Sequence, residues 1–156
     1  MMKCAGSNTN SGGSFDCSFA DGPANSTVSV QATDSDNDAG NTDTQSVHVN
    51  NVAPTVMLSN LNDLSVFEGS THTYSYSISD PGQDTVTSVA VSCGAAGTLV
   101  GSPSNTDTSG SFDCKFPDGP DTSSVTAKAT DSDGDAGNTA SQTVTVANVA
   151  PTATLS

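Results

Sequence analysis

The stretch "GSFDCKFPDGPDTSSVTAKATDSDGDAG", Gly110–Gly137, sets apolar residues at alternate positions between clusters of Asp, Gly and Pro. Two alternating runs stand out: Phe112, Cys114 and Phe116, and then Val125, Ala127 and Ala129. A period of two is the pattern of a β-strand with one buried face. Because turn-forming residues separate the runs, the stretch predicts two half-buried strands joined by a tight connection.

The same stretch occurs a second time, 97 residues earlier, as "GSFDCSFADGPANSTVSVQATDSDNDAG" at Gly13–Gly40. The match continues without a gap to Ser59 and Ser156, and only the segment before it, between paired cysteines, differs in length, by eight residues. A segment that tolerates such a change is expected to be a surface loop. A fixed period predicts a tandem array. Residues 1–51 are then the C-terminal half of one repeat, 52–148 a complete repeat, and 149–156 the first strand of another.

The complete repeat contains further alternating apolar residues, namely Val56 and Leu58, Tyr74, Tyr76 and Ile78, Val89, Val91 and Cys93, and Val144 and Val146. No stretch has a convincing helical period. About seven short strands in about a hundred residues predict an all-β fold, with immunoglobulin-like β-sandwich repeats in tandem. An unrelated β-barrel is an alternative that accounts less well for the paired half-repeats.

Composition limits the classes of partner. Only 26 of the 156 residues are Leu, Ile, Val or Phe, and the net charge is -14, so the chain borders on compositions typical of disorder. Fifteen Val against five Leu favour strands.

The charged residues exclude one class of partner. With Lys3, Lys115 and Lys128 as the only fixed cations, nucleic acid is excluded as a partner. No apolar run is long enough for membrane insertion.

The four cysteines form two pairs, Cys4 with Cys17 and Cys93 with Cys114, at equivalent places in the two copies. Neither pair has the spacing of a metal site, so we expect two disulfides and an extracellular or cell-surface location. Four reduced, buried thiols are the alternative.

Several segments together resemble polycystic-kidney-disease (PKD) type and related bacterial immunoglobulin-like repeats: "EGSTHTYSYSISDPGQD", "FDCKFPDGPDTSSVTAKATDSDGDAG" and "VTVANVAPT". The linker "NVAP" is similar to the linkers of cadherin-type junctions. The resemblance covers nearly the whole chain. It implies a rigid spacer or an adhesive module, part of a fibre, stalk or adhesin that contacts copies of itself or neighbouring repeats end to end.

The acidic loop Asp131–Gly137 resembles the start of an EF-hand loop, but Ala136 and Gln142 stand where glycine and glutamate are required. In an immunoglobulin-like sandwich this loop lies at the same pole as the loop between the second and third strands. Ca²⁺ is the expected cation there, and a solvated turn is the equally weighted alternative. The candidate ligands are Asp80, Asp84, Asp131, Asp133, Asp135, Asp34, Asp36, Asp38 and Glu68.

We predict that the chain is not an enzyme, because neither His48 nor His72 has a nucleophile and an orienting carboxylate at a convincing spacing. The competing function is an accessory polysaccharide-binding or spacer module of a secreted hydrolase, which would require Tyr74 or Tyr76 to be exposed. A cell-surface ligand is a further expected class of partner. Asn25 begins the sole N-glycosylation sequence, "NST".

Overall fold

The computed structural model describes residues 3–155; residues 1, 2 and 156, which the predicted domain ranges include, lie outside it. The regular elements in this range are all β-strands, and none of its segments is a helix long and apolar enough to cross a membrane. The chain divides into two compact units, Met1–Val52 and Ala53–Ser156, here named unit 1 and unit 2. The predicted boundary near residue 148 stays a prediction.

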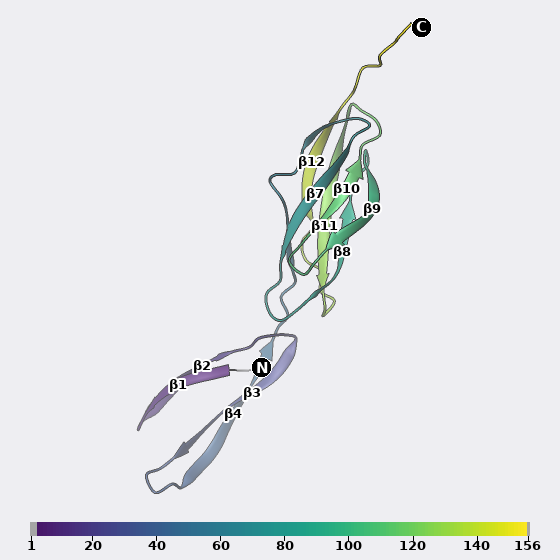
Figure 1. The fold of residues 1–156 in the computed structure, drawn as a ribbon. Coiled ribbons are helices and arrows are strands. Elements are labelled where there is room, and N and C mark those ends of the chain that lie inside the picture. The colour runs from purple at the N-terminus through teal and green to yellow at the C-terminus, as the bar shows by residue number, and fades with distance from the viewer. Residues whose placement is uncertain (1–2, 156) are drawn as a thin grey trace. The chain divides into compact units, whose positions relative to one another are not determined.

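Unit 2 consists of two four-stranded sheets (Figure 1). The first has the order β5-β7-β10-β9, with bounds Thr55–Leu58, Thr71–Ser79, Ser109–Lys115 and Thr98–Asn105. The second has the order β6-β12-β11-β8, with bounds Ser65–Phe67, Ala140–Ala147, Asp121–Asp131 and Val86–Ser92. All pairs are antiparallel except β6 with β12. These orders define an immunoglobulin-like β-sandwich, so the predicted fold class is confirmed.

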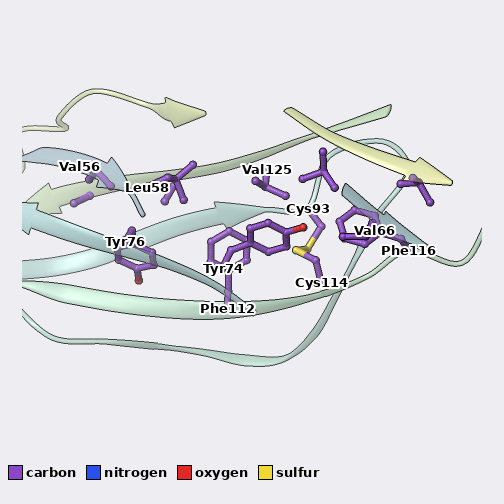
Figure 2. Close-up of a cluster of buried hydrophobic side chains, with 14 of the residues drawn as sticks. Val56, Leu58, Val66, Tyr74, Tyr76, Cys93, Phe112, Cys114, Phe116 and Val125 are labelled. Carbon is purple, nitrogen blue, oxygen red and sulfur yellow. A yellow bond between two sulfur atoms is a disulfide. The ribbon is translucent and has the colours of Figure 1, made fainter. Parts of the chain in front are cut away.

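The core of unit 2 is made by the alternating residues of both sheets. The side chains of Tyr74 and Phe112 lie beside the disulfide in the middle of the sandwich, as Figure 2 shows. Their ring centroids are 5.8 Å apart, and the Tyr74 hydroxyl donates a hydrogen bond of 3.0 Å to the Asp63 carbonyl. Ser and Thr side chains occupy the outward, exposed positions of β7 and β12. The period of two in the sequence therefore corresponds to one buried and one wet face.

The disulfide of unit 2 joins the two sheets. Cys93 directly follows β8, and Cys114 lies in β10, with the two Cα atoms 5.6 Å apart. In antibody domains the inter-sheet disulfide joins the second and sixth strands instead. A small core lacking tryptophan is thus cross-linked at a different point of the same architecture.

Two strands of unit 2 were not expected from the sequence. The segment predicted as a surface loop between Cys93 and Cys114 contains β9, which pairs with β10 across a register shift between Ser111 and Asp113. Leu99 and Val100 remain exposed there, because β9 is an edge strand. The three residues of β6 are too few to reveal alternation in a sequence.

Unit 1 consists of two antiparallel hairpins (Figure 1). The first joins β1 (Lys3–Thr9) to β2 (Gly12–Ser18), and the second joins β3 (Ala24–Thr33) to β4 (Ala39–Val49). The Cys4–Cys17 disulfide links residues directly opposite each other in the first hairpin. Each hairpin is a separate two-stranded sheet.

The second hairpin of unit 1 has the same register as its counterpart in unit 2. Val28 lies opposite Gln45, as Val125 lies opposite Gln142, 97 residues further along the chain. The bridge between Thr33 and Ala39 corresponds to that between Thr130 and Ala136. The repeated sequence therefore specifies this hairpin locally in both units.

Candidate functional site

Three predicted acidic residues meet at one end of the unit 2 sandwich. Asp80 follows β7, Asp84 precedes β8, and Asp131 is the last residue of β11. One carboxylate oxygen from each lies within 4.8 Å of the others. The strand order causes this approach, because β8 and β11 pair side by side and bring the two connections together. One metal ion could contact all three carboxylates.

Asp131 also holds the acidic loop in shape. Its side chain is buried, and its Oδ1 accepts hydrogen bonds from the backbone N–H groups of Asp133, at 3.1 Å, and Asp135, at 2.8 Å. Gly134 has a φ of 89°, a conformation that favours glycine. The alternation of Asp and small residues is thus explained in part by turn geometry.

The loop in unit 1 has the same construction. Asp34 Oδ1 accepts from the N–H groups of Asp36 and Asp38, both at 2.9 Å, and Asn37 takes the left-handed conformation at a φ of 70°. Asparagine tolerates that conformation better than most residues with a side chain. Asp34, Asp36 and Asp38 are all exposed, and none belongs to a cluster of three ligand groups within the described residues.

Asp80 has the least favourable surroundings of the cluster. Both of its carboxylate oxygens are shielded from solvent, and neither has a hydrogen-bond partner within residues 3–155. Burial, followed by the nearby charges of Asp131, Asp107 and Asp133, raises the pKa of Asp80 above its usual value. An ionised Asp80 is therefore a buried charge among like charges, which a cation would stabilise.

Asp107 is an acidic residue near this cluster that sequence reasoning missed. Its Oδ1 accepts a hydrogen bond of 3.1 Å from the N–H of Val86, at the start of β8, and its charge acts on Asp80. It lies in the segment predicted as a surface loop, so no spacing in the sequence connected it to Asp80.

The neighbouring segments fix the position of the cluster. The Ser132 hydroxyl donates to Asp84 Oδ1 at 3.2 Å, and Asn138 forms two hydrogen bonds with the backbone of Val56, at 2.8 and 3.0 Å. A Cβ on Gly137 would collide with the Pro54 carbonyl. The acidic loop is therefore packed closely against the start of β5.

Glu68, the remaining predicted ligand, lies apart from the acidic cluster. Its Oε2 accepts from the N–H of Gly119 at 2.7 Å, and its Oε1 accepts from the N–H of Val149 at 2.8 Å. Both oxygens thus bind backbone, and Glu68 and Asp135 belong to no cluster of three ligand groups in the described part of the chain. Glu68 therefore holds the segment that follows β12 against the sandwich through hydrogen bonds.

The side chains of a serine, a histidine and an aspartate contact one another in the order of a catalytic triad. Ser70 Oγ is 2.9 Å from His72 Nε2, and His72 Nδ1 is 3.3 Å from Asp63 Oδ2. However, the Ser70 hydroxyl donates to the Phe67 carbonyl, and the Ser70 N–H donates to that same carbonyl. The Phe67 carbonyl therefore competes with the imidazole for the hydroxyl proton that a general base must accept.

No family model matches the chain, and no curated protein matches it. Similar solved structures include the D00-D0 domain of intimin, which is 20% identical with a TM-score of 0.47 and covers 62% of this chain. This chain spans half the length of that structure. The BIgI domain of the beta protein from S. agalactiae is 17% identical with a TM-score of 0.41, over 62% of this chain and 99% of that one. At these identities the strand order of unit 2 carries the assignment of the fold.

Proposed function

We propose that the chain is a non-enzymatic structural protein, whose tandem immunoglobulin-like repeats form part of an extracellular fibre, stalk or adhesin. The observation that carries the proposal is that unit 2 closes a complete sandwich between two copies of the same linker, Asn51–Pro54 and Asn148–Pro151. The repeated linker supports a tandem array in which one sandwich follows another along the chain. The linker and the loop sequences favour the PKD-type and related bacterial immunoglobulin-like repeats as its relatives.

The contacts of Glu68 support a mechanical role for the chain. Its carboxylate ties Val149, at the exit of the sandwich, to Gly119 in the turn before β11. Hydrogen bonds to a charged acceptor are stronger than neutral ones. Force applied along the chain would therefore have to break these hydrogen bonds before it pulls Val149 away from the sandwich.

The disulfides support an extracellular location, where oxidised cysteines persist. Asn25 is exposed in β3, which leaves it accessible to a glycan. Tyr74 and Tyr76 are 0% and 3% exposed, so neither provides the aromatic platform on which the polysaccharide-binding alternative depended. The burial of both rings argues against that alternative.

The proposal can be tested by stretching tandem copies of residues 53–149 with a single-molecule force probe. Each copy should unfold in a separate step. Reduction of the Cys93–Cys114 bond should lengthen every step by about 70 Å, since 21 residues of sequence separation are then released at about 3.3–3.6 Å each. Smooth extension without steps would contradict a structural role.

We also propose that Asp80, Asp84 and Asp131 bind Ca²⁺. Their spacing and the unsatisfied oxygens of Asp80 support a hard cation with oxygen ligands. A cation that binds only the folded state stabilises it by about 2.7 kcal/mol at a hundred times its Kd.

The measurement is thermal unfolding of the full chain with calcium and with chelator. Calcium should raise the Tm of the unaltered chain and leave that of Asp80→Asn unchanged. Asp43→Asn removes the same charge from an exposed position in β4 and should keep the full calcium response. Equal responses in all three chains would show that the cluster does not bind the ion.

A further inference from the structure

Unit 1 exposes residues whose counterparts form the core of unit 2. Phe15 is 43% exposed, whereas Phe112, at the equivalent position, is 2% exposed. Val30 is 55% exposed, whereas its counterpart Ala127 is fully buried. A groove of about 620 Å³ lies between the two hairpins of unit 1 and is lined by Phe15, Val30 and Ala32 among others. In unit 2 the equivalent faces are covered by core residues that come from the first half of the repeat.

The strands of unit 1 also have open edges where those of unit 2 are paired. Within residues 3–155, β2 pairs with β1 alone, whereas its counterpart β10 pairs with both β9 and β7. Likewise β3 pairs with β4 alone, whereas β11 also pairs with β8, and β12 also pairs with β6. Every strand that covers these faces and edges in unit 2 comes from residues 53–92.

Polar side chains of unit 1 match the backbone of the same missing strands. In unit 2, Asn138 bonds to the backbone of Val56, and Gln142 Nε2 donates to the Ser59 carbonyl at 3.0 Å. Unit 1 has the same residue types at the equivalent positions, Asn41 and Gln45. These amides favour an extended polypeptide as the occupant over a small ligand or an apolar surface.

A glycine indicates which side chain that polypeptide carries. In unit 2 a Cβ on Gly110 would collide with the ring of Tyr76, which lies directly opposite it in the β7 to β10 pairing. Gly13 is the counterpart of Gly110 and likewise has no side chain in the place of that ring, although a Cβ on Gly13 would also approach the Ser7 carbonyl of its own hairpin, at 2.8 Å.

We propose that unit 1 is the docking surface for the first half of an equivalent repeat, a polypeptide with the sequence pattern of residues 53–92 that pairs with the open edges of β2, β3 and β4. The proposal rests on the tandem-repeat function proposed above and names the partner of its open face. In the docked state, Phe15 lies opposite the residue equivalent to Tyr74, Gly13 opposite that equivalent to Tyr76, and Val30 opposite that equivalent to Val91.

A second copy of this chain is a poorer occupant. Its own residues 53–92 already cover the core of its unit 2, so donating them would expose that core. Its segment 149–155 repeats only the sequence of β5 and its preceding linker. Such a tail could meet the amide of Asn41, but β5 pairs with β7 and with no other strand of unit 2, so the tail would find no pairing edge on unit 1.

The experiment compares the full chain with a chain that carries an added copy of residues 53–92 ahead of Met1. Amide hydrogen exchange in β2 and β3 should slow by about a hundredfold or more in the extended chain, because the open edges become paired. A third chain, with Tyr76→Asp and Ile78→Asp in the added copy only, should exchange like the unextended chain.

A second variant, placed in unit 1 itself, tests whether the added copy acts through the docking surface. Val30→Asp should leave the Tm of the unextended chain nearly unchanged, because Val30 is exposed there, and should abolish the slowing of exchange in the extended chain. Exchange that does not slow on extension, or a unit 1 that light scattering shows to be dimeric and protected without it, would overturn the proposal.

The two proposals can fail separately. The stretching experiment uses only residues 53–149, and its outcome does not depend on unit 1. If those repeats unfold in steps while the added half-repeat leaves β2 and β3 unprotected, only the docking proposal fails. If they extend without steps while protection appears, the structural function fails and the docking surface stands.

Discussion

Units 1 and 2 share a sequence over nearly half a repeat, yet only unit 2 buries it. The hairpins β3–β4 and β11–β12 have matching registers, so turns and alternation suffice to form them. Burial of Phe112 additionally needs β7, which comes from the other half of the repeat, whereas Phe15 has no such cover within unit 1. The comparison separates what a sequence specifies locally from what requires a partner sheet.

The largest expected difference between the units comes from truncating the equivalent phenylalanines. Phe112→Ala should lower the free energy of unfolding of unit 2 by about 3–5 kcal/mol, because it leaves a cavity beside Tyr74. Phe15→Ala should cost less than about 1 kcal/mol, because its ring is already partly in water. Denaturant unfolding of the two variants measures both values. Equal losses would mean that unit 1 is closed in solution.

Alkaline pH should destabilise unit 2 through its tyrosines. Burial, and next the charge of Asp63, raises the pKa of Tyr74 from 10.0 to about 12. Below pH 10 both the folded and unfolded states keep the proton, so the stabilisation is complete. Between pH 10 and about 12 the unfolded state loses it first, and stability falls by about 2–3 kcal/mol.

Tyrosinate absorbance can follow this loss, and it reports on unit 2 alone, because both tyrosines of the chain lie there. Tyr74→Phe should be the less sensitive chain over the same pH range, although it also lacks the hydrogen bond to the Asp63 carbonyl. A tyrosinate signal that appears near pH 10 without unfolding would contradict the buried position.

A smaller effect is expected from Glu68, the only glutamate of the chain. Glu68→Ala removes the acceptor for the N–H groups of Gly119 and Val149 and should cost unit 2 about 1–2 kcal/mol. Hydrogen exchange at Val149 should rise, whereas Glu68→Gln should retain part of the protection. No change at Val149 would show that the clamp is not formed in solution.

The sequence predicted the fold class because nearly every core strand of unit 2 alternates cleanly. It did not reveal β9, whose apolar residues remain at an exposed edge, or β6, whose single buried residue is Val66. At the site, knowledge of strand order was enough to bring Asp80, Asp84 and Asp131 together. The contribution of Asp107 and the backbone contacts of Glu68 depend on loop paths, and alternation carries no information about those.

The position of the cysteines has a consequence for biogenesis. Cys93 is the first residue after β8, and Cys114 follows it, so both sulfur atoms of a repeat belong to its second half. Cys4 and Cys17 are likewise joined within unit 1. No cross-link described here spans the two halves of a repeat. At the proposed extracellular location, each second half could therefore complete its oxidation by itself, and the sandwich could close or exchange its first half afterwards without any thiol chemistry.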